Sequence, residues 1–309
     1  MRTRPFGKTG SDVSVVGCGV MALSLAGRPP EAQSLQILRR LLQEGVRFFD
    51  TADTYGLGPG ELHHNERLVA KAVAEQPPAQ VWVATKGGTV RSAAGEWQID
   101  GAPERLYRAI CESYEALGGK VPIPLWQHHW PDPRYAIRAM LQPVRRAVDE
   151  GLVRFVGVGN YSLDQIRQAR DVVDIVSVQN QYNLWHREAE QDGILAYCEE
   201  HALVFLPWRP LGGLGLAHRL DEIPAVAKLA AEREVSPQRL LIAWQLAKSP
   251  CILPIPGARR LDHLLDCLAA ATLTLDRREV ARLDALTPAD LPRRARSSAW
   301  EQRPPLASR

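Results

Sequence analysis

Short apolar runs alternate with longer amphipathic segments along most of the chain. Eight of these runs have the length and composition of buried β-strands, at residues 13–16, 46–49, 81–84, 123–126, 153–158, 175–178, 203–206 and 252–255. Between them, apolar residues recur at intervals of three and four, which predicts one-sided helices at residues 34–44, 65–74, 103–116, 136–150 and 192–200. Strand–helix alternation is typical of a parallel sheet. The pattern therefore predicts an α/β fold, a single (β/α)8 TIM barrel over residues 1–309, in preference to a two-domain doubly wound fold.

Some segments depart from this simple repeat. Residues 1–12 are expected to form an N-terminal β-hairpin that plugs the bottom of the barrel, and residues 87–102 a long loop at its mouth. Residues 287–309 are rich in Pro and Arg and are expected to form an irregular basic tail. Further helices are expected near residues 225–233, 238–247 and 277–285.

The charge balance gives no reason to expect a polyanionic partner. The 309 residues carry a formal net charge of +3, and the segment from Pro292 onward holds five Arg and one Glu, so the rest of the chain is close to neutral. This tail lacks the length and the interleaved aromatic residues of a nucleic-acid-binding module, and we interpret it as a solvated segment. We expect no nucleic-acid partner, and no feature of the sequence predicts an oligomeric state.

The use of cysteine indicates a reducing compartment. The five cysteines have no C-x-x-C spacing, and several lie within apolar strands or helices, as buried thiols do. The N-terminus lacks the apolar core of a secretory signal, and no run approaches the roughly 20 apolar residues that a membrane span needs. We therefore expect a cytoplasmic protein without a membrane partner.

Polar residues at the ends of three predicted strands form one candidate catalytic set. Asp50 and Tyr55 follow the second strand, Lys86 the third and His129 the fourth. Carboxyl ends of parallel barrel strands converge on one mouth, so these side chains are expected to meet there. The ammonium group of Lys86 would lower the pKa of the Tyr55 phenol from its ordinary value of about 10 and make it a general acid. Asp50 would hold Lys86, and His129 would donate a hydrogen bond to a carbonyl oxygen.

Other chemistries have weaker support. The chain has His-His pairs at residues 63–64 and 128–129, but neighbouring residues of a strand point to opposite faces and no Cys, His or carboxylate spacing accompanies the pairs. No metal site is therefore expected. The sequence has no Gly-x-Ser-x-Gly elbow and no Walker loop, and Gly-Cys-Gly at residues 17–19 is too short for a dinucleotide fingerprint.

Six motifs, taken in order, resemble those of the aldo-keto reductases. They are Phe-Phe-Asp-Thr-Ala-Asp-Thr-Tyr-Gly at residues 48–56, Thr-Lys at 85–86, Gln-His-His-Trp-Pro-Asp-Pro at 127–133, Val-Gly-Val-Gly-Asn at 156–160, Val-Gln-Asn-Gln-Tyr-Asn at 178–183 and Ile-Pro-Gly-Ala at 255–258. The resemblance extends over residues 6–286, nearly the whole chain. It implies a (β/α)8 barrel that reduces aldehydes or ketones with a nicotinamide cofactor. The implied catalytic tetrad is Asp50, Tyr55, Lys86 and His129, with hydride delivery to the carbonyl carbon and proton transfer from Tyr55 to the oxygen.

The resemblance also implies residues that hold the nicotinamide. Asn160 and Gln179 match positions that hydrogen-bond the carboxamide, and Trp208 occupies the place of an aromatic residue that stacks on the ring. Gly159 stands where the family usually has Ser, so one carboxamide contact is expected to be missing. Arg209 replaces a small hydroxyl residue, and the resemblance gives it no role.

The remaining cofactor residues that the resemblance implies would bind phosphate groups. Leu211 and Gly213 lie in a segment that resembles the loop around the pyrophosphate. Gly257, Arg259 and Arg260 resemble a Pro-Gly-Ala-basic variant of the phosphate loop, and the two guanidinium groups would pair with a 2′-phosphate. NADPH is therefore favoured, with NADH possible; the alternative is that these arginines are only the solvated start of a helix.

The adenosine end departs most from the family pattern. Asp266 stands where many members carry Glu, His263 where they carry Arg, and Cys267 where they carry an Asn that contacts adenine. On this resemblance, Asp266 is a candidate cofactor residue.

A narrower resemblance concerns the substrate. Residues 177–187 and 205–208, with Trp-Gln-Leu-Ala at 244–247, look like the bacterial group that includes pyridoxal reductases. Pyridoxal is one candidate aldehyde, and sugar-derived or natural-product carbonyl compounds are others. Aromatic walls suit flat or apolar carbonyl compounds. The expected walls of the substrate pocket are Met21, Trp97, Trp130 and the segment around Trp300.

Together these features predict NADPH-dependent reduction of a small-molecule aldehyde or ketone to the alcohol. One alternative is a nicotinamide-binding sensor or regulatory barrel with little turnover, against which the intact tetrad argues. A second is the alcohol dehydrogenase direction, for example from pyridoxine to pyridoxal. A barrel hydrolase or lyase would need a nucleophile or metal that the sequence does not offer.

Overall fold

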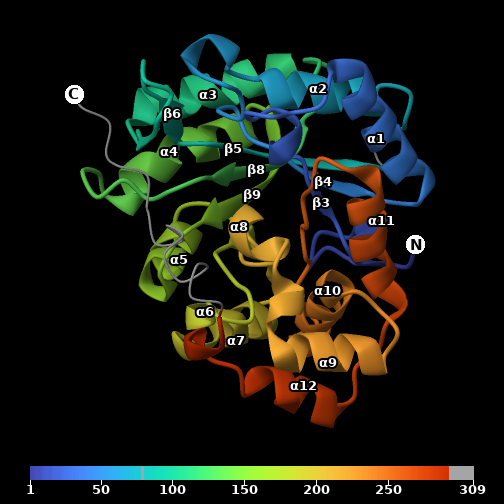
Figure 1. Cartoon of the computed structure of the whole chain (residues 1–309). Helices are drawn as coiled ribbons and strands as arrows, with labels where there is room; N and C mark the ends of the chain where they lie inside the picture. Colours follow the sequence, from blue (N-terminus) through green and yellow to red (C-terminus); the bar gives the residue numbers. More distant parts are fainter. Residues whose placement is uncertain (78–79, 292–309) are drawn as a thin grey trace.

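The computed structural model describes residues 1–77 and 80–291, and its sheet confirms the predicted α/β barrel. Seven parallel strands form a curled sheet in the order β11-β10-β9-β8-β5-β4-β3. Helices surround these strands as a ring (Figure 1). The strands are β3 Cys18–Gly19, β4 Phe48–Asp50, β5 Trp82–Gly87, β8 Ile123–His128, β9 Val153–Gly159, β10 Ile175–Gln179 and β11 Val204–Phe205.

Residues 252–256 take the place of the eighth strand and close the barrel. On one side, the N–H of Leu253 donates to the carbonyl oxygen of Phe205 at 2.9 Å. On the other side, the N–H of Gly17 donates to the carbonyl oxygen of Pro254 at 2.9 Å. Because proline has no N–H to donate in return, the closing ladder is incomplete, although the chain follows the strand path that the apolar run predicted.

The predicted helices are present, most of them within a few residues of their expected bounds. The longer ones are α1 Glu31–Gln43, α2 His64–Val73, α3 Pro103–Ala116, α4 Ile137–Asp149, α5 Leu163–Arg170, α7 Ile194–Glu200, α9 Pro224–Glu232, α10 Pro237–Lys248, α11 Leu261–Ala269 and α12 Arg277–Asp284. The helix expected at residues 192–200 starts later, because Gly193 adopts a φ of 74° and separates α7 from α6. Two single-turn helices are α6 Glu188–Gln191 and α8 Leu214–Ala217, and short 3-10 helices are Met21–Leu23, Pro59–Glu61, Leu220–Glu222, Ala270–Thr272 and Pro288–Asp290.

The N-terminal hairpin plugs the barrel, as predicted, but it is longer than expected. β1 Thr3–Pro5 pairs antiparallel with β2 Asp12–Ser14. Phe6 is fully buried and stacks on Phe48 with ring centroids 5.5 Å apart, so the hairpin seals the bottom of the barrel with an aromatic contact.

The expected first barrel strand at residues 13–16 is wrong. The first half of that apolar run belongs to the hairpin, and the first barrel strand is β3. A Cβ atom on Gly19 would lie 2.9 Å from the carbonyl oxygen of Ile255, so the chain needs glycine where β3 closes against residues 252–256. A strand that contains glycine lacks the apolar pattern that predicts strands.

The predicted mouth loop at residues 87–102 contains a second hairpin. β6 Thr89–Arg91 pairs antiparallel with β7 Trp97–Ile99, and Gly95 supplies a φ of 78° in the turn. The predicted basic tail falls mostly on residues 292–309, which lie outside the described residues, as does Trp300.

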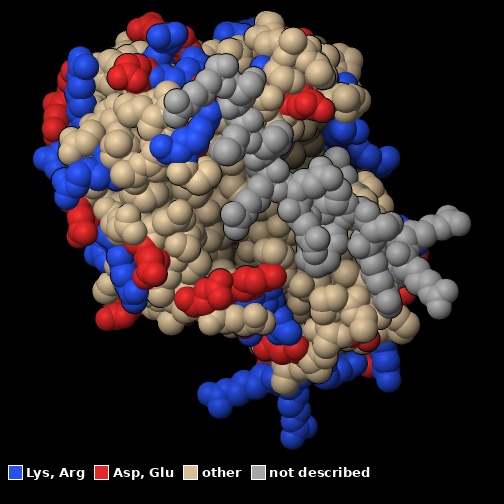
Figure 2. Space-filling view, turned by 90° about the vertical axis from the view of Figure 1, so that its left-hand side faces the viewer, with Lys and Arg blue, Asp and Glu red and all other residues tan. Residues whose placement is uncertain are grey.

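Two clusters of buried apolar residues stabilise the barrel. The larger lies between the strands and the helices, and the smaller fills the bottom of the barrel interior with Phe6, Phe48, Trp82, Leu125, Val176 and Leu206. Apolar filling at the bottom leaves the carboxyl ends of the strands as the place where polar side chains gather. On the face that Figure 2 shows, basic and acidic side chains are interspersed. Among the described residues, no helix has the length and apolar character needed to span a bilayer.

Candidate active site

Asp50, Lys86 and Tyr55 meet at the carboxyl ends of β4 and β5, as the sequence predicted. The Nζ atom of Lys86 lies 2.6 Å from Oδ1 of Asp50 and 3.2 Å from the phenol oxygen of Tyr55. It also donates to the carbonyl oxygen of Thr51 at 2.7 Å. Lys86 is fully buried, so its ammonium group is held by three oxygen atoms away from solvent.

The electrostatics of this trio differ from the expectation in one respect. Burial lowers the pKa of Lys86, but Asp50 and Tyr55 more than offset this and raise it above its ordinary 10.5, so the amine is charged. Burial raises the pKa of Tyr55 above 10, and this effect outweighs the lowering by Lys86. The expectation that Lys86 brings the pKa of Tyr55 down is therefore wrong for the protein alone. The phenol is protonated at neutral pH.

His129 follows β8 and lies beside Tyr55, with ring centroids 6.1 Å apart. Burial, with help from the charge of Lys86, lowers the pKa of His129 well below 6.5, so its imidazole is neutral. Its Nδ1 lies 3.2 Å from Oγ1 of Thr89, which in turn lies 3.0 Å from Oγ1 of Thr54. Neither threonine was predicted from the sequence, because a hydroxyl that contacts only another side chain leaves no motif.

Two strand-end amides support Asp50. Nε2 of Gln179, at the end of β10, donates to Oδ2 of Asp50 at 2.8 Å, and Nε2 of Gln127, on β8, donates to the same oxygen at 3.3 Å. Gln179 was predicted as a cofactor residue, whereas Gln127 was not singled out. The carboxylate thus accepts hydrogen bonds on both oxygens, which fixes its plane relative to Lys86.

Asn160 and Trp208 are brought together beside this trio. Nε1 of Trp208 donates to Oδ1 of Asn160 at 2.9 Å, and Nδ2 of Asn160 donates to the carbonyl oxygen of His129 at 2.9 Å. Asn160 adopts a left-handed φ of 63°, which Asn tolerates better than most residues. A Cβ atom on Gly159 would lie 2.8 Å from the carbonyl oxygen of His129, so this backbone has no room for the Ser of the family pattern.

The loop after β11 carries an arginine at an unusual place. The guanidinium of Arg209 lies over the ring of Trp208 at 5.4 Å, and no carboxylate among the described residues pairs with it. Burial lowers its pKa. Leu211 is half-buried, and Gly212 and Gly213 adopt φ values of 79° and 88°, a tight loop that L side chains rarely adopt.

The candidate phosphate residues are present but already bonded. Arg259 donates to the carbonyl oxygen of Ala26 at 2.5 Å, and Arg260 forms two hydrogen bonds with Asp262 at 3.0 and 2.5 Å. Gly257, just before them, is exposed. A phosphate would therefore have to exchange these hydrogen bonds for its own.

Asp266 has a partner on another helix that was not predicted from the sequence. Arg239, on α10, donates to Oδ1 of Asp266 at 2.7 and 3.1 Å, and Ser236 donates to Oδ2. This places a guanidinium group against the second half of α11, whereas Arg259 and Arg260 precede its start.

Two of the predicted pocket walls contact the site directly. Trp97 meets Tyr55 edge to face, with centroids 5.8 Å apart, and Trp130 lies 6.4 Å from Trp208. Met21 follows β3 at the mouth of the barrel, and 39% of its surface is exposed. The fourth expected wall, around Trp300, lies outside the described residues.

A buried acidic cluster, which was not predicted from the sequence, lies behind Tyr55. Asp53 is 1% exposed, and burial, with the nearby Glu66, raises its pKa to about 7. Glu66 is itself fully buried, lies 2.5 Å from Nδ1 of His63 and accepts a hydrogen bond from Thr85 at 2.5 Å. The signal was available, because Asp53 stands between a buried strand and Tyr55 in the sequence.

The two His-His pairs have separate partners. His63 lies against Glu66 and His64 against Ser24, at 2.8 Å. His128 bonds to Tyr161 at 2.6 Å, while His129 bonds to Thr89.

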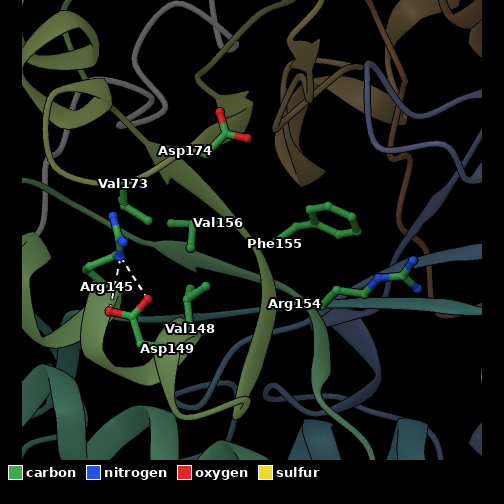
Figure 3. Close-up of a pocket in the computed structure, with 8 residues that line it drawn as sticks. All are labelled: Arg145, Val148, Asp149, Arg154, Phe155, Val156, Val173 and Asp174. Atoms are coloured by element: carbon green, nitrogen blue, oxygen red, sulfur yellow. Dashed lines mark hydrogen bonds and ion pairs between the residues drawn. The ribbon is translucent and has the colours of Figure 1, made fainter.

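A pocket of about 340 Å³ lies at the opposite end of the barrel and is separate from this site. Figure 3 shows its lining between α4 and the starts of β9 and β10, with Arg145 bonded to Asp149. Barrel strands carry their catalytic residues at their carboxyl ends, so this amino-end pocket is a poor candidate for the chemistry. Its lining residues are Arg145, Val148, Asp149, Arg154, Phe155, Val156, Val173 and Asp174.

The residues at the mouth fit a nicotinamide cofactor at its nicotinamide end. Gln179 uses Nε2 to bond Asp50, while its Oε1 accepts no hydrogen bond within residues 1–77 and 80–291 and is available to a carboxamide N–H. The indole of Trp208, anchored to Asn160, offers a planar apolar surface. This combination of an amide oxygen and an aromatic surface suits a planar ring with an amide group.

Comparison with known proteins shows the family and the fold of the chain. The model of the Aldo/keto reductase family matches residues 15–288. An uncharacterized oxidoreductase of Schizosaccharomyces pombe is 34% identical over 276 residues, covering 88% of this chain and 86% of that protein. Two solved structures have a similar fold. A thermostable aldo-keto reductase bound to the inhibitor epalrestat has a TM-score of 0.77 at 24% identity, covering 92% of this chain and 99% of its own. An aldo-keto reductase of Klebsiella pneumoniae in complex with NADPH has a TM-score of 0.76 at 22% identity, covering 92% of this chain and 95% of its own.

Proposed function

This chain belongs to the aldo/keto reductase family, and from that premise we propose that it reduces an aldehyde or ketone to the alcohol with NADPH. The observation that carries the proposal is the contact of 3.2 Å between the phenol oxygen of Tyr55 and the ammonium group of Lys86. A protonated phenol beside a fixed positive charge is suited to give up its proton as negative charge develops on a carbonyl oxygen.

Tyr55 is the general acid in this proposal. The cofactor, when bound, supplies a hydride to the carbonyl carbon. Tyr55 donates its proton to the carbonyl oxygen, and the charge of Lys86, 3.2 Å away, stabilises the phenolate that remains. Asp50 keeps that ammonium group in place and compensates its charge in the buried site.

His129 orients the carbonyl oxygen. Its imidazole is neutral because burial and Lys86 lower its pKa, so it acts as a hydrogen-bond donor and not as an acid. When the Thr89 hydroxyl donates its proton to Nδ1 of His129, Nδ1 is the acceptor, and the proton of the neutral imidazole is on Nε2. Nε2–H can then donate to the carbonyl oxygen while Tyr55 delivers the proton.

Asn160, Gln179 and Trp208 would hold the nicotinamide, and Leu211 to Gly213 would bound the pyrophosphate. Gly257 gives the exposed backbone next to Arg259 and Arg260, which would pair with the 2′-phosphate, and Asp266 would line the adenosine end. Replacement of Arg259 and Arg260 by Ala should raise the KM for NADPH and leave that for NADH almost unchanged. An unchanged preference between the two cofactors would contradict this assignment.

The substrate pocket lies between Met21, Trp97 and Trp130. Aromatic walls favour flat or apolar carbonyl compounds, and pyridoxal stays a candidate on the narrower resemblance alone. Because the proton transfer is reversible, the same residues support alcohol oxidation, with the Tyr55 phenolate as the base.

The proposal is tested by comparing wild type with Tyr55→Phe. NADPH and NADH consumption is measured over a panel of aldehydes and ketones that includes pyridoxal, together with the Kd for each cofactor. Tyr55→Phe should lower kcat by roughly 10²- to 10⁴-fold and leave the Kd for NADPH within about threefold, since only the phenol hydroxyl is removed. Tyr197→Phe, which removes a hydroxyl bonded to Arg170 on the outer ring of helices, is the matched control.

Two outcomes would contradict the proposal. Turnover that survives in Tyr55→Phe would remove Tyr55 as the acid. Tight NADPH binding by wild type without turnover of any carbonyl compound would favour the sensor or regulatory barrel instead.

A further inference from the structure

About half of the arginines in the described part of the chain, 13 of 27, pair with a carboxylate, and Arg91 is one of those that do not. Thirteen guanidinium groups have such a partner: those of Arg28, Arg40, Arg105, Arg134, Arg145, Arg146, Arg167, Arg187, Arg219, Arg233, Arg239, Arg260 and Arg282. Within the described residues, the only hydrogen bond of the Arg91 side chain is from Nη2 to the carbonyl oxygen of Leu57, at 3.3 Å. Its positive charge therefore has no negative counterpart there.

Arg91 lies at the mouth, on the side of the β6–β7 hairpin that faces the catalytic residues. Thr89 contacts His129, and side chains two residues apart on a strand share a face, so Arg91 projects to the same side as Thr89. Trp97 is directly opposite Arg91 in the hairpin, and the guanidinium lies 4.4 Å above the Trp97 ring. Trp97 in turn contacts Tyr55 at 5.8 Å.

The surroundings of Arg91 disfavour an unpaired positive charge on its guanidinium group. Nε is buried and has no hydrogen-bond partner, and burial lowers the pKa of the guanidinium without any carboxylate to raise it again. The Trp97 ring compensates only in part, since a cation–π contact contributes about 0.5–2 kcal/mol. A carboxylate placed against Nη1 would supply the missing negative charge, and arginine binds carboxylates in a well-defined geometry.

We propose that Arg91 and Trp97 form a subsite for a carboxylate carried by the carbonyl substrate. This inference rests on the proposed function, because it places the reacting carbonyl at Tyr55 and His129 and the carboxylate across Trp97. The substrates that fit are aldehydes or ketones with a carboxylate separated from the carbonyl by a flat or apolar spacer, which packs on the indole.

A structural explanation for Arg91 makes a different prediction. If the side chain only ties the hairpin to Leu57 and covers Trp97, its loss would weaken turnover of all carbonyl substrates equally. Recognition of a carboxylate instead requires a loss that is specific to anionic substrates. The two explanations are separated by a pair of substrates that differ in one charged group.

The experiment compares kcat/KM for 4-carboxybenzaldehyde and 4-methylbenzaldehyde, with saturating NADPH, in wild type, Arg91→Gln and Arg91→Lys. Arg39→Gln, at an exposed position of α1, is the control for the change in net charge. Arg91→Gln should lower kcat/KM for the carboxylate substrate by roughly 10- to 100-fold and that for the methyl substrate by less than about threefold. Arg91→Lys should recover part of the loss, and Arg39→Gln should change neither value.

A binding measurement keeps the inference separate from the proposed function. The Kd of 4-(hydroxymethyl)benzoate for the NADP⁺-bound enzyme is measured by calorimetry, and it should rise by a similar factor in Arg91→Gln. Equal losses for both aldehydes, or an unchanged Kd, would overturn the carboxylate subsite and leave the reductase intact. If wild type turned over neither aldehyde, the proposed function would be in doubt, and the calorimetric Kd alone would decide whether Arg91 binds the carboxylate.

Discussion

The hydroxyl oxygen of Thr89 lies 3.2 Å from Nδ1 of His129 and so joins the mouth hairpin to the candidate catalytic set. A neutral imidazole has one donor and one acceptor nitrogen, and a hydroxyl that donates to Nδ1 leaves the proton on Nε2. Thr89→Val removes this donor with little change in volume. We expect kcat to fall about tenfold or more with a small change in KM, since the substrate still binds but its oxygen loses a donor.

The tautomer of His129 gives a readout that does not depend on turnover. ¹⁵N chemical shifts of His129 should report the Nε2–H form in wild type and a smaller share of it in Thr89→Val. Thr89→Ser keeps the hydroxyl and should restore both the shifts and kcat. An unchanged tautomer in Thr89→Val, or no recovery in Thr89→Ser, would contradict the role of Thr89.

Arg209 should bind a phosphate of the cofactor. Its guanidinium stacks on Trp208 without a carboxylate partner in the described part of the chain, and the Cδ atom lies 3.3 Å from where a Cβ of Gly213 would be. It therefore borders the loop proposed to surround the pyrophosphate, which NADPH and NADH share. Arg209→Ala should raise the Kd for both cofactors by about tenfold, measured by quenching of tryptophan fluorescence. A selective loss of NADPH affinity would instead place Arg209 at the 2′-phosphate.

The sequence predicted most of the strands, and the meeting of Asp50, Tyr55, Lys86 and His129 at the mouth, because both have local signals. Apolar runs mark buried strands, and Asp50, Lys86 and His129 each stand where such a run ends. The barrel closure was harder to place, because β3 contains Gly19 and the closing segment contains Pro254, neither of which has the pattern of a strand. The barrel fold followed from the periodicity of apolar residues, whereas the closure between β3 and residues 252–256 depends on close backbone contacts.

Contacts between side chains on different elements were beyond the sequence. Thr89 touches His129 across the mouth, and Arg239 reaches Asp266 from another helix. The pKa of Tyr55 was predicted from a single neighbour, Lys86, but depends more on burial, which the sequence does not show. The pKa of a group that interacts with charges on several helices and strands can be predicted only when the fold is known.

Removal of the Asp50 carboxylate charge should destabilise the barrel. Lys86 is fully buried, and its ammonium group lies 2.6 Å from Asp50. Asp50→Asn leaves a buried positive charge without its counterion, which costs about 3–5 kcal/mol in the free energy of unfolding. Urea unfolding measures this cost. The double variant Asp50→Asn, Lys86→Met should be more stable than the sum of the two single losses predicts, and additive losses would argue against the pairing.

The raised pKa of Tyr55 predicts opposite pH profiles for the two directions of the reaction. Reduction needs the protonated phenol, which persists because burial keeps the pKa of Tyr55 above 10, so kcat/KM for reduction should stay nearly level from pH 8 to 9. Alcohol oxidation needs the phenolate and should rise almost tenfold per pH unit over the same range. A fall in reduction over this range would mean that the pKa of Tyr55 is lower in the working enzyme.

Asp53 should make the stability of the protein depend on pH. Its ordinary pKa of 3.8 rises to about 7 in the folded protein, because the carboxyl group is buried and faces Glu66, with His63 and Arg105 offsetting the shift in part. The folded state therefore keeps a proton that the unfolded state loses between pH 4 and 7. The contribution of Asp53 to stability is complete below pH 4 and is lost as the pH rises to about 7, by up to about 4 kcal/mol.

Asp53→Asn removes this dependence, since an amide does not ionise. The variant should gain stability relative to wild type as the pH rises from 4 to 8, measured as the difference in free energy of unfolding in urea. Asp164→Asn, whose carboxyl group is 83% exposed, should show no such trend. His63, whose pKa is raised by Glu66 and in smaller part by Asp53 against the effect of burial, loses its own contribution at higher pH in both proteins, and this contribution is smaller in Asp53→Asn. A difference between Asp53→Asn and wild type that stays constant from pH 4 to 8 would mean that Asp53 is already ionised in the fold, with a counterion closer than Arg105.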